Sequence, residues 1–514
     1  MQQAVRAQTR AGIFATQLNK CAETVARALV LCVALTVGAA ANAGPISIGL
    51  HTQDWFFMWE GGKDLKENSR LDKSQVIRWQ VSERTLDRYR DLGAEWSVVT
   101  LHQDHDGPDG FARIKRLVNE YKKRGIKPVF RLIENLMLYD HLASKSGAMG
   151  YNVEYYQWVK QIAEIFQYDV EYYLISNEID HDIGYNQIKY SHRIISYDQY
   201  LKVLETAYKA IKGVNSNLKV ADHGITTLAV VLAACEDLLK SGHLADAYRL
   251  WRKSRYDRAE ESGSLVNFPF MFSKEWARQR ISIARDTFLR PGPSDVYQLH
   301  DYEDWEALPE IMAWIETRMQ ETGVRRPLIV TEIGYRIFPK TSKDWKGNKK
   351  LVADFDKYSQ EDHAQNLAKD FAILLSHNID LALYWHSRIW DVNYSPIATL
   401  YKNTNDPDEF KPYLAAEAYA FLARTLNGRT ATKAKLLPQR PGLYEYAFSG
   451  SDNVSIVWAV EGNITLLAHE IAKAVKISDM LGKQILLPVS QTLTVNMRPV
   501  YLFWSRDSIA QKVQ

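Results

Sequence analysis

Two glutamates stand where apolar, strand-like segments end. Glu178 follows the run YYLIS at residues 172–176, with Asn177 between them, and Glu332 follows the run PLIVT at residues 327–331. Two carboxylates that face each other across a cleft can be held in different protonation states by burial, neighbouring charges and hydrogen bonds. One can then donate a proton while the other attacks or activates water, which is what cleavage of a glycosidic bond requires.

Each of these glutamates also has an ordinary structural explanation. An Asn-Glu pair can begin a helix as a cap followed by an acidic first turn, and a Thr-Glu pair at a strand end is no more specific. Their occurrence at the ends of two separate strands favours the catalytic interpretation. A separation of ~5–5.5 Å between the carboxyl groups would indicate retention of configuration and ~6.5–9.5 Å would indicate inversion. The sequence leaves both open.

Eight short apolar runs alternate with amphipathic helical patterns after residue 44, and both glutamates belong to this series. The runs are ISIGLH (46–51), WSVVTLH (96–102), KPVFRLIE (127–134), YYLISNE (172–178), LKVADHG (218–224), DVYQLHDY (295–302), PLIVTEIGY (327–335) and LALYWHS (381–387). Continuous apolar runs are typical of parallel strands that are covered on both faces. We therefore predict an α/β fold with a (β/α)8 TIM barrel over residues 44–427, in which the carboxyl ends of the strands form the active site. The alternative, a doubly wound open sheet, lacks a glycine-rich phosphate-binding turn after its first strand.

Five further side chains lie at or near the expected strand ends, and their types suit the binding of sugars. They are Trp55 after the first strand, His102 on the second, His300 and Tyr302 on the sixth, and Trp385 on the eighth. Flat aromatic faces stack on the C–H surfaces of sugars. Alternatives stay open for three of them: His300 as a structural histidine, Trp385 as an aromatic cap on the core, and Trp55 as part of a loop that packs on the rim.

The segments SNE (176–178) and TEIGY (331–335) resemble the signature of clan A glycoside hydrolases. The chain after residue 43 also loosely resembles glycoside hydrolase family 39 and its bacterial exopolysaccharide-associated relatives. This resemblance implies a retaining, double-displacement hydrolysis of O-glycosidic bonds, with Glu178 as the acid/base and Glu332 as the nucleophile.

The resemblance also implies roles for residues around the two glutamates. Asn177 would hold the sugar 2-hydroxyl or the nucleophile, Tyr302 would hydrogen-bond the nucleophile, and Trp385 would form the floor of the sugar subsite. The clan usually places an arginine near the end of strand two, where this chain has Val98. Arg131 on the third strand is expected to supply that positive charge instead.

Two segments extend beyond the regular barrel pattern. Residues 228–293 separate the fifth and sixth strands by more than one helix and are rich in Arg, Lys and Trp. This composition indicates either a wall of the cleft or a solvated helix face. Residues 428–514 change to short alternating strands, which predict a small all-β sandwich module.

The first 43 residues have the pattern of a secretory signal. Basic residues precede the apolar run ALVLCVALTVGAAA, and Ala41 and Ala43 match a small-residue cleavage site. We expect residues 1–43 to be removed and the protein to be secreted or periplasmic, with an uncleaved anchor as the alternative. Cleavage would leave Cys235 as the single cysteine, so no intrachain disulfide is expected. No later segment is long and apolar enough to predict a membrane span.

Composition and motifs narrow the expected partners. The net charge of +3 is too small to indicate a nucleic-acid-binding protein. No HExxH or clustered-cysteine pattern is present, so neither a metal nor another cofactor is expected. The expected partner is a poly- or oligosaccharide substrate.

Two alternatives to hydrolysis stay open, a non-catalytic polysaccharide-binding barrel and a transglycosidase of exopolysaccharide metabolism. The sugar, its linkage, endo or exo cleavage and the oligomeric state are not predicted.

Overall fold

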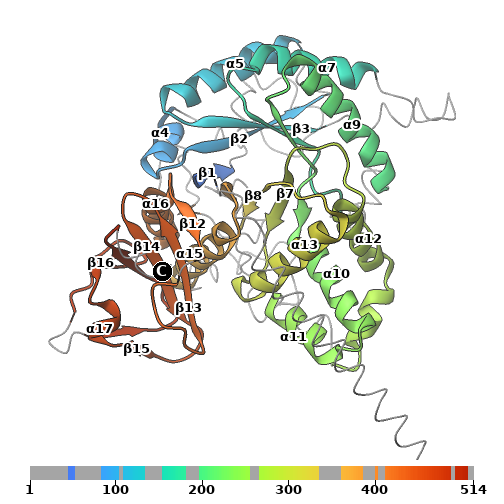
Figure 1. The fold of residues 1–514 in the computed structure, drawn as a ribbon. Coiled ribbons are helices and arrows are strands. Elements are labelled where there is room, and N and C mark those ends of the chain that lie inside the picture. Colours follow the sequence, from blue (N-terminus) through green and yellow to red (C-terminus); the bar gives the residue numbers. More distant parts are fainter. Residues whose placement is uncertain are drawn as a thin grey trace, which may run out of the picture. The chain divides into compact units, whose positions relative to one another are not determined.

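The computed structural model places a large part of the chain after residue 43 (Figure 1). The described residues are 44–51, 83–103, 108–133, 153–180, 196–254, 265–334, 360–385, 400–402, 411–433, 435–487 and 492–506. Gly44–Gln514 form one compact unit. The expected signal segment at residues 1–43 lies outside the described residues, so its cleavage and the export of the protein stay predictions.

Nine parallel strands form one sheet in the order β5-β4-β3-β2-β1-β9-β8-β7-β6. Their bounds are β1 Ser47–His51, β2 Trp96–His102, β3 Lys127–Ile133, β4 Tyr172–Ile175, β5 Lys219–Ala221, β6 Ile225–Thr226, β7 Tyr297–Asp301, β8 Leu328–Ile333 and β9 Leu381–Trp385. A parallel bridge joins Ala221 of β5 to Val296, the residue before β7, so the sheet closes on itself. The predicted (β/α)8 barrel is confirmed, with β6 as a two-residue addition that follows β5 after a turn.

Helices cover the outside of this barrel (Figure 1). They are α4 Glu83–Asp91, α5 Pro108–Lys123, α7 Val153–Phe166, α9 Tyr197–Val214, α10 Thr227–Lys240, α11 Leu244–Ser254, α12 Glu275–Leu289, α13 Leu308–Thr322, α15 Gln360–Ser376 and α16 Leu414–Leu426, with 3-10 turns η3 Phe268–Ser273 and η4 Trp305–Ala307. Local signals fix their ends: Ser196 and Gln199 form a capping box at the start of α9. Gly323 ends α13 at a φ of 70°, a conformation that glycine adopts readily.

The inside of the barrel changes from apolar to polar along the strands. The apolar layer consists of Trp96, Val98, Val129, Leu174, Ala221, Val296, Ile329, Leu381 and Leu383. Strand side chains alternate between faces, so the residue two positions later on a strand also points inward. On β2, β3, β7 and β8 those next residues are Thr100, Arg131, Gln298 and Thr331, and all of them are buried. A buried polar layer therefore supports the carboxyl ends of the strands.

The segment between β6 and β7 holds α10, α11, η3 and α12, and its helices have both buried and exposed faces. Residues 227–235 of α10 are all buried. Trp251 of α11 is 1% exposed and Arg280 of α12 is 8% exposed. Arg249, Arg252 and Arg278 are exposed, so the expected solvated charged face is present. Trp251 and Arg280 depart from it, because periodicity does not reveal which face of an inserted helix packs inward.

After α16 the chain forms antiparallel sheets. A five-stranded sheet contains β12 Thr430–Thr432, β13 Leu443–Ser449, β14 Asn453–Ala459, β18 Val500–Trp504 and β16 Ala474–Asp479, and a two-stranded sheet contains β15 Ile464–Leu466 and β17 Leu493–Val495. The remaining elements are β10 Tyr401–Lys402, β11 Lys411–Pro412 and α17 Ala468–Ile471. Both sheets contribute side chains to one apolar core, as predicted for a small sandwich. Trp458 of β14 packs edge-to-face with Trp305 of η4 at 5.6 Å between ring centroids. None of the helices in the described part of the chain is long and apolar enough to cross a membrane.

Candidate active site

Glu332 lies near the end of β8, where the strand pairing is irregular. The register between β7 and β8 shifts between Leu299 and His300, and the register between β8 and β9 shifts between Val330 and Ile333. A bulge of this kind re-aims side chains and is common beside active sites. Glu332 is 3% exposed, and its carboxylate contacts residues from three other barrel strands or their ends.

Three groups approach the Glu332 carboxylate with hydrogen-bonding atoms. Arg131 Nη1 donates to Oε1 at 2.7 Å, and the Tyr302 hydroxyl donates to Oε2. His51 Nδ1 lies 3.2 Å from Oε1. Burial raises the pKa of Glu332 above its usual value, while Arg131 and Tyr302 oppose this shift by favouring the carboxylate. The site therefore supplies a buried carboxylate with dedicated donors on both oxygens.

Glu178 follows β4 in an unusual backbone conformation. Ser176 has a φ of 70° and Glu178 a φ of 42°, a region that non-glycine residues rarely adopt. The Glu178 N–H donates to the His223 carbonyl oxygen at 2.7 Å, which ties this turn to the end of β5. The side chain of Glu178 is 16% exposed, and its carboxylate lies against His300.

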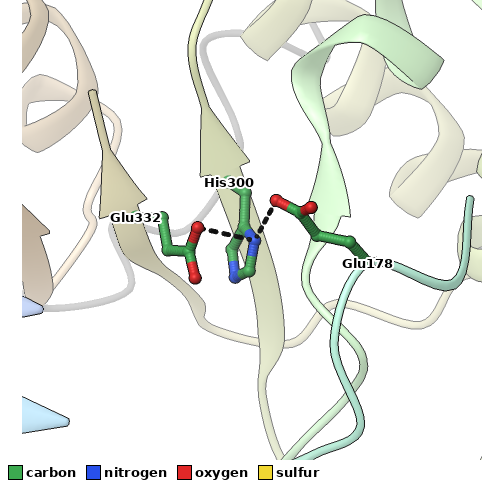
Figure 2. A group of neighbouring side chains, drawn as sticks. All are labelled: Glu178, His300 and Glu332. Atoms are coloured by element: carbon green, nitrogen blue, oxygen red, sulfur yellow. Dashed lines mark hydrogen bonds and ion pairs between the residues drawn. The ribbon is translucent and has the colours of Figure 1, made fainter. Parts of the chain in front are cut away.

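His300 on β7 connects the two carboxylates (Figure 2). Its Nδ1 lies 2.8 Å from Glu178 Oε1 and 3.5 Å from Glu332 Oε2. Burial lowers the pKa of His300, but the charges of Glu332 and Glu178 outweigh it, so that this pKa is raised. One carboxylate oxygen of each glutamate and one ring nitrogen of His300 all lie within 4.8 Å of one another. The two carboxylates thus share one small, largely buried region.

Arg131 places a positive charge against Glu332. It comes from β3, and its Nη1 also donates to Asn177 Oδ1 at 2.6 Å. Its Nε donates to Thr100 Oγ1 at 3.1 Å. The guanidinium therefore links the residue before Glu178 to the carboxylate of Glu332, and it sets the position of both.

The other predicted site residues are placed less completely. Trp385 at the end of β9 is 8% exposed, and its ring meets the ring of His51 edge-on at 4.3 Å between centroids. His102 ends β2, but its side chain lies outside the described part of the structure, as does all of Trp55. Sugar-binding roles for these three residues stay predictions.

The sequence did not point to two buried polar residues beside His300. Gln298 Nε2 lies 2.7 Å from His300 Nε2 and 2.5 Å from Thr331 Oγ1. Strand alternation is a signal for Gln298, because it stands two residues before His300 on one strand. Alternation from the inward-facing Ile329 is likewise a signal for Thr331, although a regular strand would then turn its neighbour Glu332 to the opposite face.

A buried acid and a helix of the insert hold the segment that follows Glu178. Asp180 is fully buried and accepts hydrogen bonds from the Thr226 hydroxyl and from the Thr226 N–H at 3.3 Å. Burial raises the pKa of Asp180 to about 6. Arg280 of α12 donates through Nε to the Asp180 carbonyl oxygen at 3.1 Å. The insert therefore supports the acid-bearing turn from behind.

Among the described residues, Glu178, His300 and Glu332 form the one group of acids and histidines close enough to hold a metal ion. Their donor atoms are already engaged with one another and with other side chains. The Arg131 guanidinium also lies 2.7 Å from Glu332, and a second cation beside it would be repelled. The group fits an acid pair with a connecting histidine better than it fits a metal site.

Neither a protein-family model nor a curated relative matches the chain. Among solved structures, the chain is similar to a family 39 glycoside hydrolase, a β-xylosidase from Caulobacter crescentus, with 11% identity, a TM-score of 0.48, and coverage of 90% of this chain and 97% of that one. It is also similar to a family 30 endoxylanase from Clostridium papyrosolvens C71, with 12% identity, a TM-score of 0.44, and coverage of 82% and 93%. A glucosidase from Croceicoccus marinus has 14% identity, a TM-score of 0.41, and coverage of 83% and 78%. The function proposed below rests on the contacts of the site residues and not on these similarities.

Proposed function

We propose that the protein is a retaining glycoside hydrolase that acts on a poly- or oligosaccharide. The observation that carries this proposal is that one carboxylate oxygen of Glu178 and one of Glu332 lie within 4.8 Å, with His300 between the two side chains (Figure 2). This spacing supports retention, for which the carboxyl groups lie ~5–5.5 Å apart. Inversion needs ~6.5–9.5 Å, because a water molecule must enter.

The surroundings of the two acids support a division of roles. Glu332 receives hydrogen bonds from Arg131 and from Tyr302, and both favour the ionised form that a nucleophile needs. Glu178 is the more exposed of the two. Its Oε1 faces His300, which can donate a hydrogen bond to it while the ring stays neutral. When the pair carries one proton, we place that proton on Glu178, which makes it the general acid.

Two displacements follow from this assignment. In the first, a Glu332 oxygen bonds to the anomeric carbon, the bond to the leaving oxygen breaks, and the Glu178 proton moves to that oxygen. In the second, Glu178 takes a proton from water, the water oxygen bonds to the anomeric carbon, and the ester bond to Glu332 breaks. Arg131 and Tyr302 stabilise the carboxylate that is consumed and regenerated. The contact of Arg131 with Glu332 removes the reason for preferring a non-catalytic binding barrel.

Matched variants test these roles on phenyl and 2,4-dinitrophenyl glycosides. Glu332→Gln is expected to abolish turnover of both substrates. Glu178→Gln is expected to slow phenyl glycosides by about 100-fold or more, and azide is expected to restore turnover of dinitrophenyl glycosides by attacking the glycosyl-enzyme in place of water. Glu445→Gln is the control, because Glu445 is 6% exposed but lies in the C-terminal sandwich. Undiminished turnover by Glu332→Gln contradicts the proposal.

Export to the cell envelope and a role in trimming an exopolysaccharide are part of the same proposal. Export is supported by the signal-like pattern of residues 1–43, and the exopolysaccharide role is supported by the family resemblance. Amino-terminal sequencing of the protein recovered from its native host tests the first point. A mature chain that begins at Gly44 is expected, and a chain that retains the first 43 residues contradicts cleavage.

A further inference from the structure

The side of the His300 ring that faces away from the two glutamates is enclosed by polar atoms. His300 Nε2 lies 2.7 Å from the Gln298 amide nitrogen and 3.0 Å from Thr331 Oγ1. The same amide nitrogen lies 2.5 Å from Thr331 Oγ1. All three residues are 0% exposed, so protein groups rather than bulk water determine what this ring nitrogen can do.

The opposite ring nitrogen must carry a proton. His300 Nδ1 lies 2.8 Å from Glu178 Oε1 and 3.5 Å from Glu332 Oε2. An ionised Glu178 only accepts hydrogen bonds, so Nδ1 is the donor whenever Glu178 is charged; when Glu178 holds its proton on Oε2, its Oε1 still accepts from Nδ1–H. The charge of the ring then depends on Nε2. In the neutral ring Nε2 carries a lone pair and accepts a hydrogen bond, and in the cation it carries a proton and donates one.

The Gln298 amide decides between these two states of Nε2. With its nitrogen toward the ring, the amide donates to Nε2 and to Thr331, and the ring must be neutral. With the amide reversed, its oxygen would accept from a protonated Nε2, and the two N–H donors would take the place of Oε1. Gln298 Oε1 is buried without a hydrogen-bond partner among the described residues. An unsatisfied carbonyl oxygen is tolerated in protein interiors more often than unsatisfied N–H groups, which favours the amide with nitrogen toward the ring.

The absence of a side chain at Gly224 leaves room for the contact between His300 and Gln298, and the Gly224 backbone covers one side of that contact. A Cβ at this position would lie 2.4 Å from His300 Nε2 and 2.8 Å from Gln298 Nε2. Gly224 also has a φ of 71°, which suits glycine better than any residue with a side chain. The backbone of the turn between β5 and β6 therefore packs directly on the ring and the amide.

We propose that Gln298, held by Thr331, is a positioning residue that keeps the His300 ring neutral by donating to its Nε2, so that Glu178 can keep the proton it must deliver. The protonation state of His300 stands on these contacts alone, while the consequence for Glu178 rests on the proposed glycoside hydrolysis.

The charged surroundings explain why such a residue is needed. The titratable and charged groups that face His300 are Glu178, Glu332, Arg131, Asp222 and His223. The two glutamates attract a second proton to the ring, whereas burial and the guanidinium disfavour it. A cationic His300 would hold Glu178 in its ionised form and remove the general acid. A donor against Nε2 prevents this without adding a charge.

The tautomer can be measured without a substrate. The protein has 13 histidines, and in a sample labelled with nitrogen-15 at histidine, the spectrum of His300→Asn identifies the His300 signals. At pH 7 we expect one protonated nitrogen, Nδ1, in the native protein and two in Gln298→Glu, whose carboxylate accepts from Nε2–H. Gln365→Glu is the matched control, since Gln365 is 8% exposed but lies on α15. It is expected to leave His300 neutral.

Two results overturn the proposal. The first is a native His300 that is doubly protonated, or protonated at Nε2 alone, at pH 7. The second is a Gln298→Glu spectrum with an unchanged His300. If Gln298→Glu does not fold, Gln298→Met takes its place, and a His300 pKa that does not rise in this variant contradicts the role of the amide.

A kinetic comparison tests the link to Glu178. In Gln298→Glu, kcat/KM for phenyl glycosides is expected to fall by about 100-fold, because these need the general acid. From dinitrophenyl glycosides the dinitrophenolate leaves without needing a proton, so kcat/KM for these substrates is expected to change little. Equal losses for both substrates contradict a role in acid catalysis. A native protein that cleaves no glycoside refutes the proposed function instead, and the tautomer measurement is unaffected.

Discussion

Replacing Arg131 with methionine removes the cation that lies against Glu332 and keeps most of the buried side-chain volume. Arg131 is 7% exposed, and its Nη1 donates to Glu332 Oε1 at 2.7 Å. At an effective dielectric constant of about 20, unit charges about 4 Å apart attract each other by ~4 kcal/mol, which equals ~3 pH units of titration. Because Tyr302 still donates to the carboxylate, we expect the titration of Glu332 to move by about 2 pH units.

The direction of this change follows from the sign of the charge. Arg131 favours the ionised Glu332, so its loss raises the pKa of Glu332 further above its usual value. The acidic limb of kcat/KM reports the ionisation of the nucleophile in the free enzyme. Measured with a dinitrophenyl glycoside between pH 4 and 9, this limb is expected to move upward. At pH values below the acidic limbs of both proteins, kcat/KM of Arg131→Met is expected to be about 100-fold lower than that of the native protein.

Arg124→Met is the matched control for this experiment. The Arg124 side chain is 9% exposed and pairs with Asp87 and Glu120, each at 2.8 Å, in the helix layer. Its loss is expected to lower the urea midpoint and to leave the acidic limb in place. An unchanged limb in Arg131→Met, or an equal displacement in Arg124→Met, refutes the electrostatic reasoning.

Two further predictions concern stability and are checked by urea denaturation. Gly224→Ala places a Cβ 2.4 Å from His300, whereas Gly125→Ala, at nearly the same φ, meets no described atom within 4 Å. We expect losses of about 1 kcal/mol for Gly125→Ala and about 2–4 kcal/mol for Gly224→Ala, and equal losses contradict the packing. Burial raises the pKa of Asp222 to about 7, so its stabilising contribution is lost as pH rises through that value. Asp222→Asn is expected to gain stability over the native protein between pH 4 and 7, by up to about 4 kcal/mol, and a pH-independent difference contradicts this.

The barrel and the sandwich are predictable because hydrophobic periodicity determines which faces must be buried. The run at 327–335 became β8, Leu328–Ile333, and the run at 381–387 became β9, Leu381–Trp385. The strands are shorter than the apolar runs, because apolar residues continue past the last backbone hydrogen bond between neighbouring strands. The fifth run became β5, Lys219–Ala221, and Gly224 at the end of that run turns the chain at a positive φ before β6 begins.

The site was predictable only where residues stand at strand ends. Glu178, His300 and Glu332 could be named because the carboxyl ends of parallel strands meet in a barrel. The position of Glu332 opposite His300 depends on a register shift between β7 and β8, and no composition signal specifies a bulge. The burial of Arg280 depends on how the insert folds back onto Asp180, which is a long-range contact that local patterns do not encode.

Covalent trapping tests the central claim, that Glu332 is the nucleophile of a retaining glycosidase, most directly. The native protein is incubated with a panel of 2,4-dinitrophenyl 2-deoxy-2-fluoro-glycosides, and its intact mass and peptide masses are measured. A single added fluorosugar on the peptide that contains Glu332, absent from Glu332→Gln, is the expected result. An adduct on another residue, or release of inverted product with no adduct from a glycoside that the protein cleaves, contradicts the claim.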